Sequence, residues 1–317
     1  MIAFADRLSV PAIAAPMFQV SGPELVIAAC RAGVIGAFPT SNCRSLGELD
    51  DWLGGMHSAT AAPLDDGRRA APVCANLIIR QARLGGDLER LIAHKVEMVI
   101  TSVGSPAEVV APLHTIGARV FADVASVAHA RKAIAAGVDG LVLLTAGAGG
   151  QTGWANPFAF VRAVRAFWAG PLVLAGGISD GQALWAARAL GVDFGYMGTR
   201  FIAAAESRAK DAYKRMLVAS SLDDVMTTRA FTGLDSNMLR PSIVAAGLDP
   251  DRLDEAVTPR LAKDTFGGEA EGPRRWRDLW SAGHSVSGVH EIISAAEIVR
   301  QTREEYAQAR AASAQAQ

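Results

Sequence analysis

The chain has little of several features that would otherwise narrow its function. Only three of its 317 residues are cysteine, Cys30, Cys43 and Cys74, and no two of them form a CxxC pair. Scattered cysteines of this kind indicate unpaired thiols in a reducing compartment, with neither a disulfide framework nor a metal site. The sequence also has no uninterrupted apolar run of about eighteen residues and no basic-then-apolar leader at its start. We therefore expect a cytoplasmic protein without a membrane partner.

Positive and negative charges are almost equal in number. The 31 basic and 32 acidic residues leave a net charge of −1, so the chain gives no electrostatic reason to expect a nucleic-acid partner. Hydrophobic residues make up 50% of the sequence, so a large buried core can form. A chain of this length fits either two domains or one α/β barrel with an insertion.

One pattern recurs along the first two thirds of the chain: a helix that closes on glycine, followed by a short apolar strand. In "ARALGVDFGYMGTRF", for example, Gly191 stands where such a helix would end. The apolar runs do not alternate with polar residues, which is typical of parallel strands covered on both faces. Strands are predicted at 11–16, 34–39, 72–78, 97–102, 119–123, 140–144, 172–176 and 194–198. Helices are predicted between them at 23–32, 45–54, 106–116, 126–136, 156–168 and 180–190.

Eight βα units favour a closed (β/α)8 TIM barrel, whose active groups lie on the loops that follow the strands. An open doubly wound sheet is the alternative architecture. The pattern breaks after the eighth strand, and we expect residues 204–275 to form a small α-helical lid inserted there. The barrel would then comprise residues 1–203 and 276–317, with a closing helix over 288–310.

Glycine gathers at the ends of the last three predicted strands, in "TAGAGGQTG", "LAGGIS" and "YMGTRF". Barrels often bind phosphate between their last two strands, and the absence of side chains at Gly176, Gly177 and Gly198 would let backbone N–H groups point at one anion. A helix N-terminus at Ser179 would add its partial positive charge, and Thr199 a hydroxyl donor. Glycine also makes tight turns in any βα protein, so the alternative is that these glycines only form turns and bind no phosphate.

Strand one ends on the other side of the predicted mouth in small apolar residues, Ala15, Pro16 and Met17. A flat aromatic ring can lie across such an edge while the proline fixes the backbone. A proline that merely ends a strand gives the same pattern, so this stretch alone does not decide between the two readings.

Taken together, these motifs resemble those of the nitronate monooxygenase family, formerly called 2-nitropropane dioxygenases. "AAPM", the "AN" of "VCANLI", "AGAGGQTG", "LAGGISDG" and "GYMGTRF" follow one another at spacings that fit a barrel. The resemblance covers residues from about 10 to about 205 and again "LWSAGHSVSG". It implies an FMN-dependent TIM barrel, related to flavin-dependent enoyl-ACP reductases and to an NADH:quinone reductase.

The resemblance also implies a set of flavin contacts. The phosphate is expected on Gly149, Gly150, Gly176, Gly177, Gly198 and Thr199, with Met197 at the same strand end. The isoalloxazine is expected along Ala15, Pro16 and Met17, and Asn76 is expected to bond the flavin or its ribityl chain. Ser102 and Asp123 end strands four and five and are placed to face the same cavity. Asp123 then either contacts the flavin or caps the helix that follows it.

The resemblance fails at one position that matters for catalysis. Where the family has a histidine assigned as the catalytic base, this sequence has Gln151. A neutral amide cannot act as a general base, although it can donate a hydrogen bond to a flavin nitrogen or a substrate oxygen. We therefore expect nitronates, which are already anions, to react much better than neutral nitroalkanes. His284 has the most suggestive neighbourhood of the histidines and either faces the substrate or serves the structure.

Three functions follow from these observations. The first is oxidation of alkyl nitronates with O₂ to a carbonyl compound and nitrite. The second is NAD(P)H-dependent reduction of a quinone or an activated C=C bond, which the loss of the family's base favours. Both need a small-molecule substrate, with O₂ or NAD(P)H as the second one. The third is a phosphate-binding barrel that uses no flavin.

Overall fold

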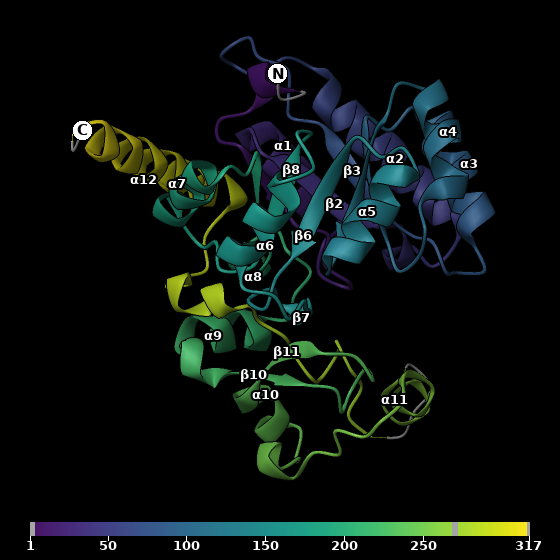
Figure 1. Ribbon diagram of the computed structural model, residues 1–317, viewed down its shortest axis with the longest axis vertical. Helices are drawn as coiled ribbons and strands as arrows, with labels where there is room; N and C mark the ends of the chain where they lie inside the picture. The colour runs from purple at the N-terminus through teal and green to yellow at the C-terminus, as the bar shows by residue number, and fades with distance from the viewer. Residues whose placement is uncertain (1–3, 268–271, 316–317) are drawn as a thin grey trace.

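Eight parallel strands form a closed barrel in the computed structural model, which describes residues 4–267 and 272–315. Their order around the barrel is β1-β2-β3-β4-β5-β6-β8-β9, so the predicted (β/α)8 TIM barrel is confirmed (Figure 1). The strands are β1 Ala12–Ala14, β2 Ile35–Pro39, β3 Val73–Ile78, β4 Met98–Ser102, β5 Arg119–Val124, β6 Gly140–Leu144, β8 Leu172–Ala175 and β9 Phe194–Met197. The helices after them are α1 Pro23–Ala32, α2 Leu46–Ala61, α3 Leu84–Ala93, α4 Ala107–Thr115, α5 Val127–Ala135, α6 Pro157–Arg165, α7 Gly181–Leu190 and, after β9, α8 Thr199–Ile202 and α12 Ala295–Gln315.

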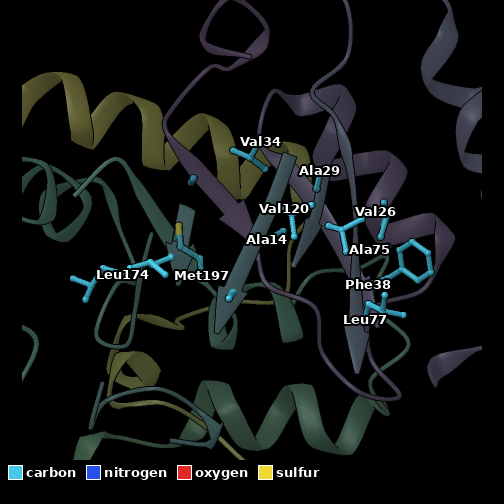
Figure 2. Packing of buried hydrophobic residues seen from close by; sticks show 14 of the residues in the cluster. Ala14, Val26, Ala29, Val34, Phe38, Ala75, Leu77, Val120, Leu174 and Met197 are labelled. Atoms are coloured by element: carbon cyan, nitrogen blue, oxygen red, sulfur yellow. The ribbon is translucent and has the colours of Figure 1, made fainter. Parts of the chain in front are cut away.

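The barrel has an inner and an outer core because alternate residues of each strand face opposite ways. Ile13, Ile100 and Val173 belong to the cluster inside the barrel. The cluster between strands and helices includes Phe38 and Leu174, as Figure 2 shows. Both faces of each strand are therefore buried, which explains why the strands appear in the sequence as continuous apolar runs.

Helix α7 ends at the residue that the sequence indicates but begins one residue later than predicted. Gly191 ends α7 in the left-handed conformation, φ +106°, with its N–H bonded to the carbonyls of Ala187 and Arg188. At the start of the same helix the cap is Asp180, whose carboxylate accepts from the N–H of Ala183. The predicted helix start at Ser179 therefore lies one residue too early.

The excursion that follows the barrel's last strand is not wholly helical, and the expectation of an α-helical lid is corrected in this respect. It contains helices α9 Asp211–Ala219, α10 Arg240–Ala245 and α11 Pro259–Phe266, but also an antiparallel pair of strands, β10 Val225–Thr228 and β11 Ser236–Leu239. A short strand from the barrel, β7 Gly150–Gln151, pairs with β11 and completes a three-stranded sheet. Strand β7 lies about 85 residues before its partner β11, and local sequence patterns do not reveal a pairing over such a separation.

The chain returns to the barrel later than predicted. A short 3-10 turn, His284–Gly288, precedes the closing helix α12, which begins at Ala295 rather than at 288. Ser294 explains this start, because its hydroxyl accepts a hydrogen bond from the N–H of Glu297 at 3.2 Å. Ala204 and Ile293 bridge to each other, so the excursion leaves and rejoins the barrel at adjacent points. Figure 1 shows it on one side of the barrel, next to β7.

In the described ranges, none of the helices combines the length and the hydropathy that a membrane-spanning segment requires.

Candidate functional site

A large cavity of about 1690 Å³ lies where the barrel strands end. Residues after each of the eight strands line it, and the excursion contributes the opposite wall through Leu234, Phe266 and Trp276. Ligand sites of TIM barrels lie at this end of the strands, and the volume exceeds what a drug-sized ligand needs. All site residues predicted from the sequence line this cavity except Met197 and His284. Those that do are Ala15, Pro16, Met17, Asn76, Ser102, Asp123, Gly149, Gly150, Gln151, Gly176, Gly177, Gly198 and Thr199.

The predicted phosphate corner has free space where an anion would need it. Gly177 has φ +80°, and a Cβ atom there would meet no other atom within 4 Å. At neighbouring Gly176, φ +118°, a Cβ would lie 2.5 Å from the hydroxyl oxygen of Thr145 and 2.8 Å from the amide nitrogen of Ala148. The backbone of β8's end therefore packs tightly against the loop after β6 and leaves an opening above Gly177.

The start of α7 does not contribute to this corner as the sequence suggests. Asp180 already accepts from the N–H of Ala183, and Glu305 of α12 accepts from the N–H of Gly181 at 2.8 Å. Two carboxylates therefore occupy the amide groups that would otherwise attract an anion. The N–H groups of the preceding loop, Gly176 to Ser179, remain the better candidates for donating hydrogen bonds to a phosphate.

Thr199 links the corner to the returning chain. Its side chain is buried, and its hydroxyl oxygen accepts a hydrogen bond from the N–H of Gly283 at 2.9 Å. Since the hydroxyl hydrogen is still free to donate, Thr199 can hold the returning segment and an anion at once.

The backbone of the strand-one edge is held by the side chain of Ser21, at the start of the segment before α1. The hydroxyl of Ser21 accepts from the N–H of Met17 at 3.0 Å and donates to the carbonyl of Ala15 at 3.2 Å. Asn42 adds a bond from Nδ2 to the carbonyl of Met17 at 3.1 Å. The apolar edge formed by residues 15–17 thus has a fixed backbone, as a platform for a flat ring requires.

Asn76 and Ser102 form a polar pair on neighbouring strands. Nδ2 of Asn76 donates to the carbonyl of Ile100 at 3.1 Å and to the hydroxyl oxygen of Ser102 at 3.2 Å. These bonds orient the Asn76 amide so that its oxygen can accept from a ligand in the cavity.

Asp123 does not cap the helix that follows it. Ser126 caps α5 by accepting from the N–H of His129 at 3.1 Å. Asp123 faces the cavity, and its Oδ1 atom is buried without any hydrogen-bond partner. Burial raises the pKa of the Asp123 carboxyl to about 7. Of the two sequence-based alternatives, the helix cap is therefore wrong.

Gln151 is held at the cavity wall by the excursion. Its backbone pairs with Ser236 in β11, and its side chain is exposed. The loop before it is fastened by Asn237, whose Nδ2 donates to the carbonyls of Ala146 and Ala148 at 2.8 and 2.7 Å. Asn237 is fully buried and was missed in the sequence. The only signal was a polar residue beside the apolar pair of "DSNML".

Met197 and His284 lie differently from the other predicted residues. The side chain of Met197 packs with Leu174 in the outer core (Figure 2), away from the cavity, and its carbonyl accepts from the N–H of Ala15 at 3.0 Å. The N–H of His284 donates to the carbonyl of Gly147 at 3.0 Å, and its side chain is exposed and outside the cavity lining. The segment is fixed beside the phosphate corner, but the ring does not face the substrate space.

Cationic side chains predominate among the described charged residues that line the cavity. The acidic lining residues are Asp123 and Asp235, and Asp235 is paired with Arg229 at 2.6 Å. Burial lowers the pKa of Arg275. The cationic residues that line the cavity are Arg80, Lys132, Lys263, Arg274, Arg275 and Arg277. This arrangement favours an anionic ligand.

Comparison with known proteins places these observations in a family context. The sequence pattern that describes the family "Nitronate monooxygenase" matches residues 4–305. A nitronate monooxygenase of Paraburkholderia phytofirmans is 27% identical, with 94% of this chain and 92% of that protein aligned. A Mycobacterium tuberculosis dehydrogenase of (3aS,4S,5R,7aS)-5-hydroxy-7a-methyl-1-oxo-octahydro-1H-indene-4-carboxyl-CoA is 28% identical over 74% of this chain and 64% of its own length.

Solved structures agree with the fold. FabK from Thermotoga maritima superposes with a TM-score of 0.80 at 26% identity, covering 96% of this chain and 94% of that one. A nitroalkane oxidase from Streptomyces ansochromogenes has a TM-score of 0.79 at 24% identity, covering 98% and 99% of the two chains. At that identity the second likeness concerns the fold alone.

Proposed function

The chain belongs to the nitronate monooxygenase family, and on that premise we propose that it is an oxidoreductase that binds FMN and oxidises alkyl nitronates with O₂ to a carbonyl compound and nitrite. The observation that carries the proposal is the unfilled space above Gly177, beside the fixed platform of residues 15–17 and inside a cavity of about 1690 Å³. FMN, when bound, supplies an acceptor for the substrate's electrons that O₂ can reoxidise.

The residues present fit a flavin mononucleotide. The loop Gly176 to Ser179 and the hydroxyl of Thr199 would hold the phosphate. Ala15, Pro16 and Met17 would support the ring system, and the amide oxygen of Asn76 would accept from its polar edge or the ribityl chain. The apolar platform adjoins the polar donors, because β1 pairs with β9 and a Cβ at Gly198 would lie 3.7 Å from the Cβ of Ala15. Neighbouring apolar and polar walls suit a ligand with a flat apolar end and a charged tail.

The charge of the outer cavity supports an anionic substrate. A nitronate carries one negative charge, and the cationic side chains at the entrance, such as Lys132, Lys263 and Arg275, would attract it. Gln151 would orient the substrate by donating a hydrogen bond to a nitronate oxygen, since its amide lies at the cavity wall. The excursion would act as the lid that keeps water from the site.

A direct test starts with the colour of the purified protein. We expect yellow protein that releases FMN on denaturation, O₂ uptake with propyl nitronate, and one nitrite for each nitronate consumed. A colourless protein that fails to bind FMN supplied in excess would contradict the assignment and favour a phosphate-binding barrel without flavin.

A second candidate on the same scaffold is an NAD(P)H-dependent reductase of quinones or activated C=C bonds. The presence of Gln151 in place of a base favours it, because a reductase needs no base at that position. The likeness to FabK at 26% identity is compatible with it. NADH consumption with a quinone, in the absence of O₂ uptake with propyl nitronate, would identify this function instead.

A further inference from the structure

Asp123 is the most unusual ionisable group in the cavity. It lies in β5, and its neighbour two residues earlier, Phe121, belongs to the inner core of the barrel, so both side chains point inwards. Its Oδ1 atom is buried and has no hydrogen-bond partner. A buried carboxyl oxygen without a partner is costly, and such groups persist mainly where a ligand or a reaction uses them.

Among the described residues, no cation is paired with Asp123 in a way that would compensate for its buried carboxyl oxygen. In the part of the chain that the structure describes, it forms no salt bridge. The polar neighbour on the adjoining strand β4 is Ser102, which is uncharged and bonded to Asn76 of the next strand, β3. The other neighbour, β6, ends in the apolar Leu144.

Two other ionisable groups interact with Asp123, and both stay neutral. Burial, followed by the Asp123 charge, raises the pKa of Tyr196 in β9 well above its ordinary value. Burial likewise raises the pKa of Cys74 in β3 well above its ordinary value. His129 and Lys132 line the cavity on α5 and form no ion pair with Asp123. Asp123 is therefore the inner group whose proton can move near neutral pH, since burial raises its pKa to about 7.

Resting on the proposed function, we propose that Asp123 is the general base of this site and takes the proton from the carbon next to the nitro group of a neutral nitroalkane. The base would then lie on strand five, in place of one at the position of Gln151 on the strand-six loop. The enzyme would thereby use nitroalkanes as well as nitronates, in contrast to the expectation from Gln151 alone.

The step is a proton transfer without oxidation. The C–H bond next to the nitro group breaks, and its electron pair moves into the nitro group to give the nitronate. The proton forms an O–H bond with the Asp123 carboxylate, and the neutral carboxyl later returns it to water. A carboxylate whose pKa lies near neutrality is matched to a weak carbon acid, because proton transfer is most efficient at such a pKa.

The experiment compares nitroethane with ethyl nitronate on the same holoenzyme, because the nitronate bypasses the proton step. We expect Asp123→Asn to lower the ratio of kcat/KM for nitroethane to kcat/KM for ethyl nitronate by at least about 100-fold. Taking the ratio cancels any general loss of flavin or of fold. Tyr196→Phe is the matched control, because it removes the other ionisable cavity group next to Asp123, and it should leave the ratio within about twofold.

Two further readouts do not depend on turnover in the variant. In D₂O without O₂, the wild-type holoenzyme should exchange the α-protons of nitroethane, as followed by ¹H NMR, and Asp123→Asn should not. In the wild type, kcat/KM for nitroethane should rise with pH and level off above about 7, whereas ethyl nitronate should not show this rise. Asp123→Glu, which keeps a carboxyl, should retain part of the exchange.

The outcomes separate this inference from the proposed function. If ethyl nitronate is oxidised but Asp123→Asn leaves both the ratio and the exchange unchanged, Asp123 is not the base while the function stands. A drop in the ratio for Tyr196→Phe but not for Asp123→Asn overturns the assignment in favour of the phenol. If the wild type oxidises neither substrate, the proposed function itself fails.

Discussion

The hydroxyl oxygen of Thr199 accepts a hydrogen bond from the N–H of Gly283 at 2.9 Å. This bond connects the end of the last barrel strand with the point where the chain returns from the excursion. Next to it, the N–H of His284 donates to the carbonyl of Gly147 at 3.0 Å. The predicted phosphate corner is therefore built from four separate stretches of chain: the loops after β6 and β8, the end of β9 and the returning segment.

Gly177 should be essential for flavin retention. Replacing it with leucine would place a side chain in the free space of the corner, so we expect Gly177→Leu to lose bound FMN, measured as visible flavin absorbance per protein. Gly117→Leu is a matched control, because Gly117 has a similar φ of +78° and open space but lies at the other end of the barrel strands. Both variants should lose about 1–2 kcal/mol of stability from backbone strain, but the control should keep its flavin. Full flavin content in Gly177→Leu would refute the phosphate corner.

Asn237 should hold the strand-six loop in place. Asn237→Ala leaves the carbonyls of Ala146 and Ala148 without their partner, and we expect a loss of about 3 kcal/mol in the free energy of unfolding, together with faster proteolysis within residues 145–153. Thr227→Val is the control, because it removes only the 2.6 Å bond from Thr227 to Oδ1 of Asn237 and leaves both donated bonds intact. Its loss should be about 1 kcal/mol. Equal losses in the two variants would argue against the clamp.

Asp123 should make the protein less stable as the pH rises. The native carboxyl has a pKa of about 7 against 3.8 as its ordinary value, so between these pH values the native state holds a proton that the unfolded state has lost. Stability therefore falls as pH increases through this window. At pH 8, Asp123→Asn should be more stable than the wild type by about 2 kcal/mol. This is roughly half of the free energy that the full pKa difference corresponds to, because water in the cavity reduces the cost of the charge. The difference should vanish near pH 4.

Asp139 provides a control of opposite sign for that experiment. Burial acts to raise the pKa of its carboxyl, but hydrogen bonds from Val120 N–H, His114 and Arg119 outweigh this and lower it. Asp139→Asn should therefore be less stable than the wild type at neutral pH, with the gap closing as the pH falls below the carboxyl's ordinary range. Thermal unfolding across pH 4 to pH 8 measures both variants. A pH-independent gap for Asp123→Asn would contradict the raised pKa.

Gln151 marks a position from which an introduced base should reach the substrate. In the Asp123→Asn background, Gln151→His should restore the ratio of nitroethane to ethyl nitronate turnover by at least about tenfold, because imidazole accepts protons near neutral pH. Gln151→Leu in the same background accepts no proton and should restore nothing. Steady-state O₂ uptake measures both double variants. If Gln151→His restores no more of the ratio than Gln151→Leu, this wall of the cavity lies too far from the reacting carbon.

Much of the fold and of the lining of the candidate site could be predicted because the relevant signals are local. The continuous apolar runs, the glycines at helix ends and the glycine-rich strand ends each depend on a few neighbouring residues. Closure of eight such strands then necessarily brings their C-terminal ends around one mouth. For this reason Ala15, Asn76 and Gly177 were found to line one cavity although more than 150 residues separate the first from the last.

The sequence-based predictions that differ from the structure concern contacts between segments far apart in the sequence. Met197 faces outwards because the pleat of β9 points Gly195 and Met197 to one side and Tyr196 to the other, and the motif did not distinguish its backbone from its side chain. The amide groups at the start of α7 are taken by Asp180 and by Glu305, a residue of the last helix. The strands of the excursion need β7 as a partner, and no local pattern announces it.

The sequence by itself determined the barrel, the family and the glycine-lined ends of the last strands, because backbone conformation and burial follow from residue type and spacing. Only the tertiary structure decided that one carboxyl oxygen of Asp123 is buried without a partner beside the cavity, that Ser126 rather than Asp123 caps α5, and that Asn237 reaches across to hold the loop before Gln151. The physical reason is that a side chain's proton affinity and hydrogen-bond partners depend on which groups surround it in space. In this barrel those groups come from strands and loops that are widely separated along the chain.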